Sequence, residues 1–313
     1  MRFAILFLLF TSPIFAQKDT SHFDYDHKAP LDVQEAAVAH RGDIAIHDIS
    51  YASPKGGRVP AYLVVPKGKG PFPAVLWGHW YWPTSEFANR KEFLEEAVVL
   101  AKSGVVSLLT SGPIARPGYQ QPKSPFTEEA AAYLEQQVID MRRGADLLLT
   151  RKDVDPMRVA YVGHSYNASV GAILSGIDKR FNSFVLMAGG LSFDVDRNTP
   201  TYQNIRNKMG TEKFDAVLAK YNWSDPGLYV SHAAPAPVFL QYASQENFLT
   251  PEVTRKYFDN VSEPKKYKLY DAPHALNSEA RRDRGMFLQS HLKLKRVDWD
   301  ALAKVPDLPQ PAN

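Results

Sequence analysis

The sequence predicts an α/β fold, with a mostly parallel, doubly wound sheet and helices on both of its faces. Strand-like and helix-like segments alternate along most of the chain, which is typical of repeated strand–helix–strand units. The exception is a polar and aromatic stretch at about 191–236, which we expect to form a small lid-like insertion. It would lie over the carboxyl-terminal edge of the sheet, where ligands bind in open α/β folds.

Apolar runs bounded by turn residues define the strands. The first two are expected at 44–51 and 59–65, joined by a turn at Gly56 and Gly57, and they add an antiparallel edge to the sheet. Six further strands are expected at 74–77, 105–109, 158–162, 183–188, 237–241 and 265–270.

Helical segments lie between these strands. Residues 87–102, the segment from Ala168 to Ser175 and residues 278–294 have helical character, and Thr127 is expected to cap a long helix. Apolar positions of that long helix recur every three or four residues, which places them on one core-facing side. These positions are Leu134, Val138, Met141, Ala145 and Leu148.

The two ends of the chain differ from its centre. Residues 1–16 have the layout of a secretory signal peptide cleaved after about Ala16, which predicts export to the periplasm or the medium. The alternative, a membrane anchor, needs roughly 20 apolar residues, and this run is shorter. We expect residues 17–40 to be loosely ordered, 41–296 to form the catalytic domain, and 297–313 to form a loose tail.

Composition excludes several classes of function. The 313 residues carry a formal net charge of +3 and contain no run of Lys or Arg longer than two, so neither nucleic acid nor a membrane surface is expected as a partner after signal removal. The absence of cysteine excludes disulfides, a thiolate nucleophile and cysteine-based zinc sites. We expect no metal and no cofactor, and the sequence does not indicate an oligomeric state.

The stretch YVGHSYNASVG, from Tyr161 to Gly171, contains the candidate nucleophile. It follows a predicted strand and precedes a predicted helix, which is the context that a G-x-S-x-G nucleophile elbow requires. Ser165 would be the nucleophile and the backbone N–H of Tyr166 one oxyanion donor. Asn167 stands where the motif has its second glycine, and the alternative role for Ser165 is an ordinary helix cap.

A base and a carboxylate must follow such a serine. His274 lies in the loop DAPHALN after a predicted strand, where a catalytic base is expected, whereas His232 and His291 lie in the insertion and in the last helix. Glu246 is the candidate carboxylate because it follows the strand PVFLQ in a short loop. Asp271 is the rival, and Glu252 is expected to be a first-turn helix charge.

The loop WGHWYWP, which follows the predicted strand 74–77, is the expected source of the second oxyanion donor, from the N–H of His79 or Trp80. Its aromatic side chains also suggest a wall for an apolar or sugar-like substrate group, formed by Trp80, Tyr81 and Trp82, while Trp77 is expected in the core.

Four ordered segments carry a resemblance to a known family. They are GRVPAYLVVPKGKGPFPAVLWGHW, RKDVDPMRVAYVGHSYNAS, APAPVFLQYASQENFLTPE and YDAPHALN. Together they resemble the α/β-hydrolase fold, and within it the dienelactone-hydrolase-like and prolyl-oligopeptidase-like esterases. Three positions depart from the usual pattern: Trp77-Gly78 replaces His-Gly, Asn167 replaces glycine, and Glu246 replaces aspartate.

The resemblance implies an exported serine hydrolase that cleaves a small-molecule carboxylic ester through an acyl-enzyme, with no cofactor. A peptidase or amidase of the same fold is an alternative, although the chain has no repeats for a propeller domain. A catalytically inactive binding protein is the third possibility.

Overall fold

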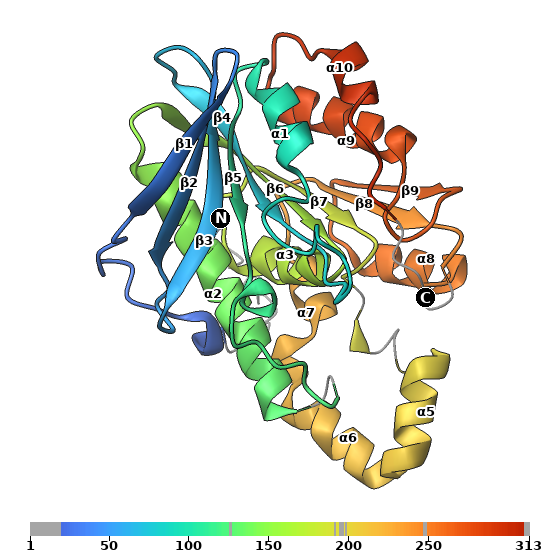
Figure 1. Cartoon of the computed structure of the whole chain (residues 1–313). Helices are drawn as coiled ribbons and strands as arrows, with labels where there is room; N and C mark the ends of the chain where they lie inside the picture. Colours follow the sequence, from blue (N-terminus) through green and yellow to red (C-terminus); the bar gives the residue numbers. More distant parts are fainter. Residues whose placement is uncertain are drawn as a thin grey trace, which may run out of the picture.

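A single mixed sheet forms the centre of the molecule (Figure 1). The computed structural model describes residues 20–124, 127–190, 192–193, 197, 199–246 and 249–309. Among these residues, nine strands follow the order β1-β2-β3-β5-β4-β6-β7-β8-β9. The strands are β1 (Gln34–Arg41), β2 (Ile44–Ala52), β3 (Arg58–Val65), β4 (Phe72–Gly78), β5 (Val106–Thr110), β6 (Val154–His164), β7 (Ser183–Met187), β8 (Val238–Ala243) and β9 (Lys265–Tyr270).

The strand directions agree with the prediction of an antiparallel edge on a parallel sheet. The pairs β1–β2, β2–β3 and β3–β5 are antiparallel, whereas every pair from β5 to β9 is parallel. Successive side chains of a strand point to opposite faces, so each central strand contributes to two cores. In β4, Ala74 and Leu76 pack on one side, while Val75 and Trp77 pack on the other.

Helices cover both faces, as expected for a doubly wound sheet (Figure 1). On one face lie α2 (Glu128–Thr150), α3 (Tyr166–Ile177), α7 (Pro226–Val230) and α8 (Pro251–Asn260). On the other face lie α1 (Leu94–Ala101), α9 (Ser278–His291) and α10 (Trp299–Ala303). Short 3-10 turns occur at Ser21–Phe23, Pro113–Ala115 and Asn222–Ser224.

The long helix α2 has the predicted cap and the predicted buried face. The Thr127 side chain accepts a hydrogen bond from the backbone N–H of Ala130. Val138, Met141, Ala145 and Leu148 are fully buried. The expected helix at 87–102 is shorter in the structure, because α1 begins only at Leu94.

Residues 87–93 form turns instead of helix, and two of their charged side chains bond to distant parts of the chain. Arg90 donates to both carboxylate oxygens of Asp48 and lies over the Tyr62 ring, and Glu92 points into the protein interior. Local helical character in the sequence carries no information about such distant partners.

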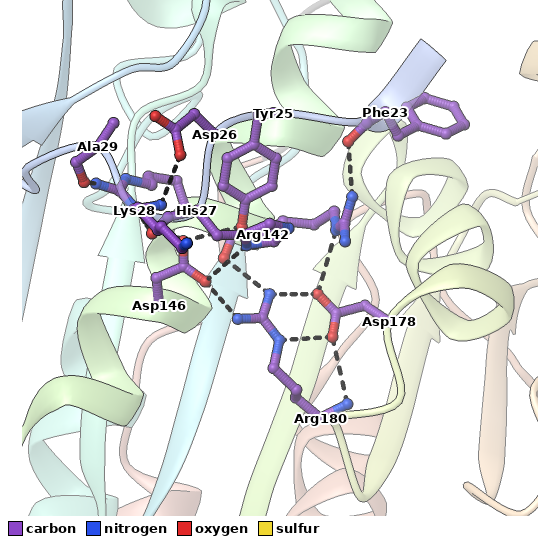
Figure 2. A network of polar contacts seen from close by, with 11 residues as sticks. Phe23, Tyr25, Asp26, His27, Lys28, Ala29, Arg142, Asp146, Asp178 and Arg180 are labelled. Atoms are coloured by element: carbon purple, nitrogen blue, oxygen red, sulfur yellow. Dashed lines mark hydrogen bonds and ion pairs between the residues drawn. The ribbon is translucent and has the colours of Figure 1, made fainter. Parts of the chain in front are cut away.

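The expectation of a loosely ordered segment at 17–40 is wrong for the part that the structure describes. Residues 34–41 form strand β1, and Phe23 is fully buried. Two arginines of α2 fix the intervening segment. Arg142 donates to the carbonyl of Phe23 at 2.6 Å (Figure 2), and Arg143 donates to the carbonyl of Ala29.

Further polar contacts anchor this amino-terminal segment. The hydroxyl of Tyr25 donates to Asp146 at 2.9 Å, and burial together with this carboxylate raises the pKa of Tyr25. Asp146 also pairs with Arg143, and with Arg180 as Figure 2 shows. The predicted signal peptide at 1–16 lies outside the described residues.

The expectation of a loose tail at 297–313 is also wrong for its described residues, 297–309. Helix α10 packs on α9 and buries Leu302. Arg281 of α9 donates to the carbonyls of Val305 and Pro306, which fixes the chain beyond α10. No helix among the described residues is long and apolar enough to cross a membrane.

Among its described residues, the insertion at 191–236 contains the helices α5 (Pro200–Met209) and α6 (Thr211–Lys220), which project from the body of the protein (Figure 1). Phe214 and Leu218 form a small cluster of their own there. The last part of the insertion belongs to the main fold, because α7 packs on α3 and buries Tyr229 and Val230.

Candidate active site

The parallel strands place the predicted site residues at one edge of the sheet. Ser165 directly follows β6, Glu246 lies three residues beyond β8, and His274 lies four residues beyond β9. Because the carboxyl ends of parallel strands meet at the same edge, residues far apart in the sequence meet here.

Ser165 lies on a sharp turn between β6 and α3. Its backbone adopts φ 55° and ψ −113°, a conformation that is rare for a residue with a side chain. Glycines make room for the turn: an added Cβ at Gly163 would lie 2.2 Å from the carbonyl oxygen of Asn167, and one at Gly189 would lie 2.2 Å from that of Ser165. This is the strained strand–turn–helix geometry of a nucleophile elbow.

Ser165, His274 and Glu246 form a continuous hydrogen-bonded chain. The Oγ of Ser165 lies 2.8 Å from Nε2 of His274, and Nδ1 of His274 lies 2.8 Å from Oε1 of Glu246. Glu246 accepts the Nδ1–H, which leaves the Nε2 lone pair to accept the serine hydroxyl proton. The Ser165 side chain makes no helix-capping hydrogen bond, which removes the ordinary alternative for this serine.

The rival residues lie elsewhere. The Asp271 carboxylate accepts hydrogen bonds from Gln245 and Ser244. Glu252 lies in the first turn of α8, as expected. His291 packs against Phe287, and burial lowers its pKa.

The structure corrects both roles that the sequence suggested for Trp80. Its backbone N–H donates to Oε2 of Glu92 at 2.5 Å and is therefore not available to an oxyanion. Its indole is fully buried and stacks on the rings of His164 and His274, with centroids 5.2 and 6.2 Å away. The stacked indole is buried among these rings and does not line the cavity, so Trp80 forms no wall for a substrate.

The other residues of the loop after β4, Tyr81, Trp82 and His79, lie in three different surroundings. Tyr81 lines the cavity that contains Ser165, and the Trp82 ring lies 6.0 Å from the His274 ring. His79 is buried: its Nδ1–H donates to the carbonyl of Trp80, and its Nε2 accepts the backbone N–H of Gly112. Burial lowers the pKa of His79, which favours this neutral ring.

Asn167 has a structural partner that explains its departure from the elbow motif. Its Nδ2 donates to the carbonyl of His79 at 2.6 Å, and its Oδ1 accepts from Nε2 of Gln137 at 2.9 Å. The asparagine packs against Gly78, where an added Cβ would lie 2.6 Å from the Cβ of Asn167. The loop after β4 is therefore hydrogen-bonded directly to the helix that follows Ser165.

A cavity of about 700 Å³ opens beside Ser165. It lies between the loop after β4, the start of α2 and the insertion, to which Phe193 and Thr199 belong. Six tyrosines line it: Tyr81, Tyr119, Tyr133, Tyr166, Tyr202 and Tyr221. Lys123 is the one charged side chain among its described lining residues, so the cavity suits a largely neutral molecule.

Sequence reasoning did not identify several residues of this region. Glu92, His164 and Gln137 make buried hydrogen bonds beside the candidate triad. Only His164 had a local signal, since it directly precedes Ser165. Glu92 and Gln137 lie on segments whose sequence pattern indicates a helix but does not indicate which residues their side chains contact.

Comparison with solved structures identifies the fold. An acetyl xylan esterase from Paenibacillus sp. R4 superposes with a TM-score of 0.67 at 20% sequence identity, covering 84% of this chain and 89% of that one. Acetyl xylan esterase 1 from Thermoanaerobacterium sp. gives a TM-score of 0.70 at 14% identity, covering 88% and 92%. The chain has the α/β-hydrolase fold.

Two further similarities were found, one to a solved structure and one to a sequence relative. A glucuronoyl esterase from Solibacter usitatus has a TM-score of 0.56 at 15% identity over 84% of this chain and 86% of that one. A polyketide transferase from Stachybotrys chlorohalonatus is 25% identical over 266 residues, 68% of this chain and 87% of its own length. No protein-family model matches the chain.

Proposed function

We propose that this α/β-hydrolase-fold protein is a serine hydrolase that cleaves a small-molecule carboxylic ester through an acyl-enzyme. The observation that carries the proposal is the chain of two 2.8 Å hydrogen bonds from Ser165 through His274 to Glu246, at the edge of a cavity. An inactive binding protein has no chemical need for this arrangement on a strained turn.

In the proposed mechanism, His274 takes the hydroxyl proton as Oγ of Ser165 attacks the ester carbonyl. Glu246 stabilises the imidazolium, and His274 then returns the proton to the leaving alcohol as the ester bond breaks. A water molecule, deprotonated by His274, attacks the acyl group, and the proton returns to Ser165 as the carboxylic acid leaves. Each proton taken by His274 is thus returned within the cycle.

Two backbone N–H groups are proposed to bind the oxyanion. Tyr166 is the first residue of α3, so its N–H has no acceptor within the helix. Tyr81 supplies the second, because the Trp80 N–H is used by Glu92 and because Tyr81 lines the cavity with Ser165. This assignment moves the donor one residue along the loop from the sequence-based candidates.

The named relatives support an ester substrate and raise one second candidate. Solved neighbours include acetyl xylan and glucuronoyl esterases, while the sequence relative is named a polyketide transferase. Transfer uses the same acyl-enzyme but opens it with an alcohol instead of water. We also propose that residues 1–16 direct export of the protein. Amino-terminal sequencing of the protein purified from its native host tests this, because cleavage after about Ala16 would give a new amino terminus at Gln17.

The experiment treats the purified protein with a fluorophosphonate and locates the adduct by mass spectrometry. We expect a single adduct on Ser165, lost in Ser165→Ala, together with hydrolysis of p-nitrophenyl esters. Adding a primary alcohol separates the two candidates, because a transferase yields the new ester in place of the acid. A folded protein with no adduct on Ser165 and no ester turnover refutes the proposal.

A further inference from the structure

A second carboxylate–histidine pair lies beneath the candidate triad. The side chains of Glu92 and His164 are both 0% exposed, and Oε1 of Glu92 lies 2.6 Å from Nδ1 of His164. The other ring nitrogen, Nε2, lies 2.9 Å from the backbone carbonyl oxygen of His274. A carbonyl only accepts hydrogen bonds, so His164 donates to the loop that carries the catalytic base.

The second oxygen of Glu92 reaches another part of the site. Oε2 accepts the backbone N–H of Trp80 at 2.5 Å, in the loop that carries the proposed oxyanion donor. Glu92 therefore contacts the loop after β4 directly, and through His164 it contacts both the elbow and the loop after β9.

Ring stacking reinforces the same connection. The Trp80 ring stacks on His164 with an interplanar angle of 16° and on His274 with one of 12°. The rings of His164 and His274 lie 5.2 Å apart at their centroids. The His274 ring therefore stacks against two residues that Glu92 holds by hydrogen bonds, His164 through its ring and Trp80 through its backbone N–H.

We propose that Glu92, acting with His164, is a positioning residue that holds the oxyanion loop, the nucleophile elbow and the loop of His274 in register. Both side chains are completely buried and neither lines the cavity, so we place neither in contact with the substrate. A buried pair of this kind adds little net stability compared with apolar residues of similar size. Its location where the three loops meet gives it a use in geometry, because displacement of a catalytic group by about 1 Å costs roughly 100-fold in rate. This inference rests on the proposed function.

The chemistry of Glu92 offers a discriminating pair of variants. In Glu92→Gln, the amide oxygen still accepts the Trp80 N–H, and the amide N–H donates to Nδ1 of His164, whose Nε2–H still reaches His274. All three contacts persist without a carboxylate. Glu92→Met has a similar volume and breaks the contacts to Trp80 and His164.

The chain contains a matched control four residues further on. Glu96 and Arg284 form another buried pair, with side chains 3% and 6% exposed and Oε1 2.8 Å from Nε of the arginine. This pair joins α1 to α9 and contacts none of the three loops. Glu96→Met therefore loses a buried carboxylate without affecting the candidate site.

The test measures kcat and KM for a p-nitrophenyl ester, the rate of fluorophosphonate labelling of Ser165, and urea unfolding. We expect Glu92→Met to lower kcat and the labelling rate by roughly 10- to 100-fold with little change in KM. Glu92→Gln should recover most of that loss, and Glu96→Met should lose stability with kcat unchanged. His164→Phe, which keeps a ring in the stack, gives the same test if Glu92→Met fails to fold.

The outcomes separate this inference from the function on which it rests. A wild-type protein that neither turns over esters nor labels at Ser165 overturns both. An active wild type whose folded Glu92→Met or His164→Phe variant keeps its kcat and labelling rate overturns the positioning role alone. A Glu92→Gln variant as impaired as Glu92→Met also overturns it, since hydrogen-bond geometry would then not be what the pair supplies.

Discussion

Restoring the usual glycine of the elbow motif, by Asn167→Gly, should damage this protein. Asn167 is fully buried and hydrogen-bonded on both sides, to the carbonyl of His79 at 2.6 Å and to Gln137 at 2.9 Å. The glycine leaves a buried acceptor and a buried donor without partners. Each such group costs about 1–3 kcal/mol, so we expect the free energy of unfolding to fall by about 2–6 kcal/mol.

Activity should fall as well, because Asn167 holds the loop that carries the proposed oxyanion donor. Complete loss of one donor costs about 100- to 1000-fold in kcat. A loosened donor is a milder defect, and we therefore expect a loss of at least roughly 10-fold with KM little changed.

The assay combines urea unfolding, followed by circular dichroism, with kcat and KM for a p-nitrophenyl ester. Asn182→Gly is the matched control, because Asn182 accepts a backbone hydrogen bond from Val159 at 2.8 Å, in the middle of β6 and six residues before Ser165. It should lose stability and keep kcat. The reasoning is refuted if Asn167→Gly unfolds at the wild-type urea concentration and turns over ester at the wild-type rate.

Three further predictions concern the anchors of the fold and of the elbow. Arg143→Met breaks a buried ion pair, so it should lower the free energy of unfolding by about 3 kcal/mol. It should also speed trypsin cleavage near residue 28 without changing kcat. An unchanged rate of proteolysis contradicts this prediction. Burial lowers the pKa of His79, so the unfolded chain binds a proton at about pH 6.5 that the folded chain does not. Stability should therefore fall as pH drops below that value, and His79→Gln should show a shallower pH dependence in urea titrations; an identical slope contradicts it. Gly189→Ala would place a Cβ 2.2 Å from the carbonyl oxygen of Ser165 and should slow fluorophosphonate labelling at least roughly 10-fold; labelling at the wild-type rate excludes this clash.

Strand positions and the order of the site residues could be predicted from the sequence. Apolar runs and turn residues are local, so the hairpin and the parallel strands that follow it were placed correctly. Parallel strands then dictate that residues just beyond their carboxyl ends meet, which is why Ser165, Glu246 and His274 could be grouped without coordinates. Their catalytic roles stay a prediction.

Long-range polar partners could not be predicted. Glu92 has the pattern of an ordinary surface residue, yet its partner His164 lies 72 positions away. The amino-terminal segment lacks apolar periodicity, and it is fixed because Arg142 and Arg143 donate to its carbonyls. Trp80 was expected to line the substrate site because its loop is rich in aromatics, but composition does not reveal which ring turns inward.

Helices α5 and α6 of the insertion meet in a cluster around Phe214 and Leu218 that belongs to neither of the two main cores. The residues that shape one wall of the cavity and the residues that position the candidate triad therefore lie in separate stretches of the sequence. Mutations in the insertion can reshape this wall of the cavity, to which Tyr202 and Tyr221 belong, while the residues of the sheet and its loops stay unchanged. Under the proposed function, evolution can therefore change the substrate that fits the cavity by changing one contiguous segment. Such changes carry little risk to the candidate triad.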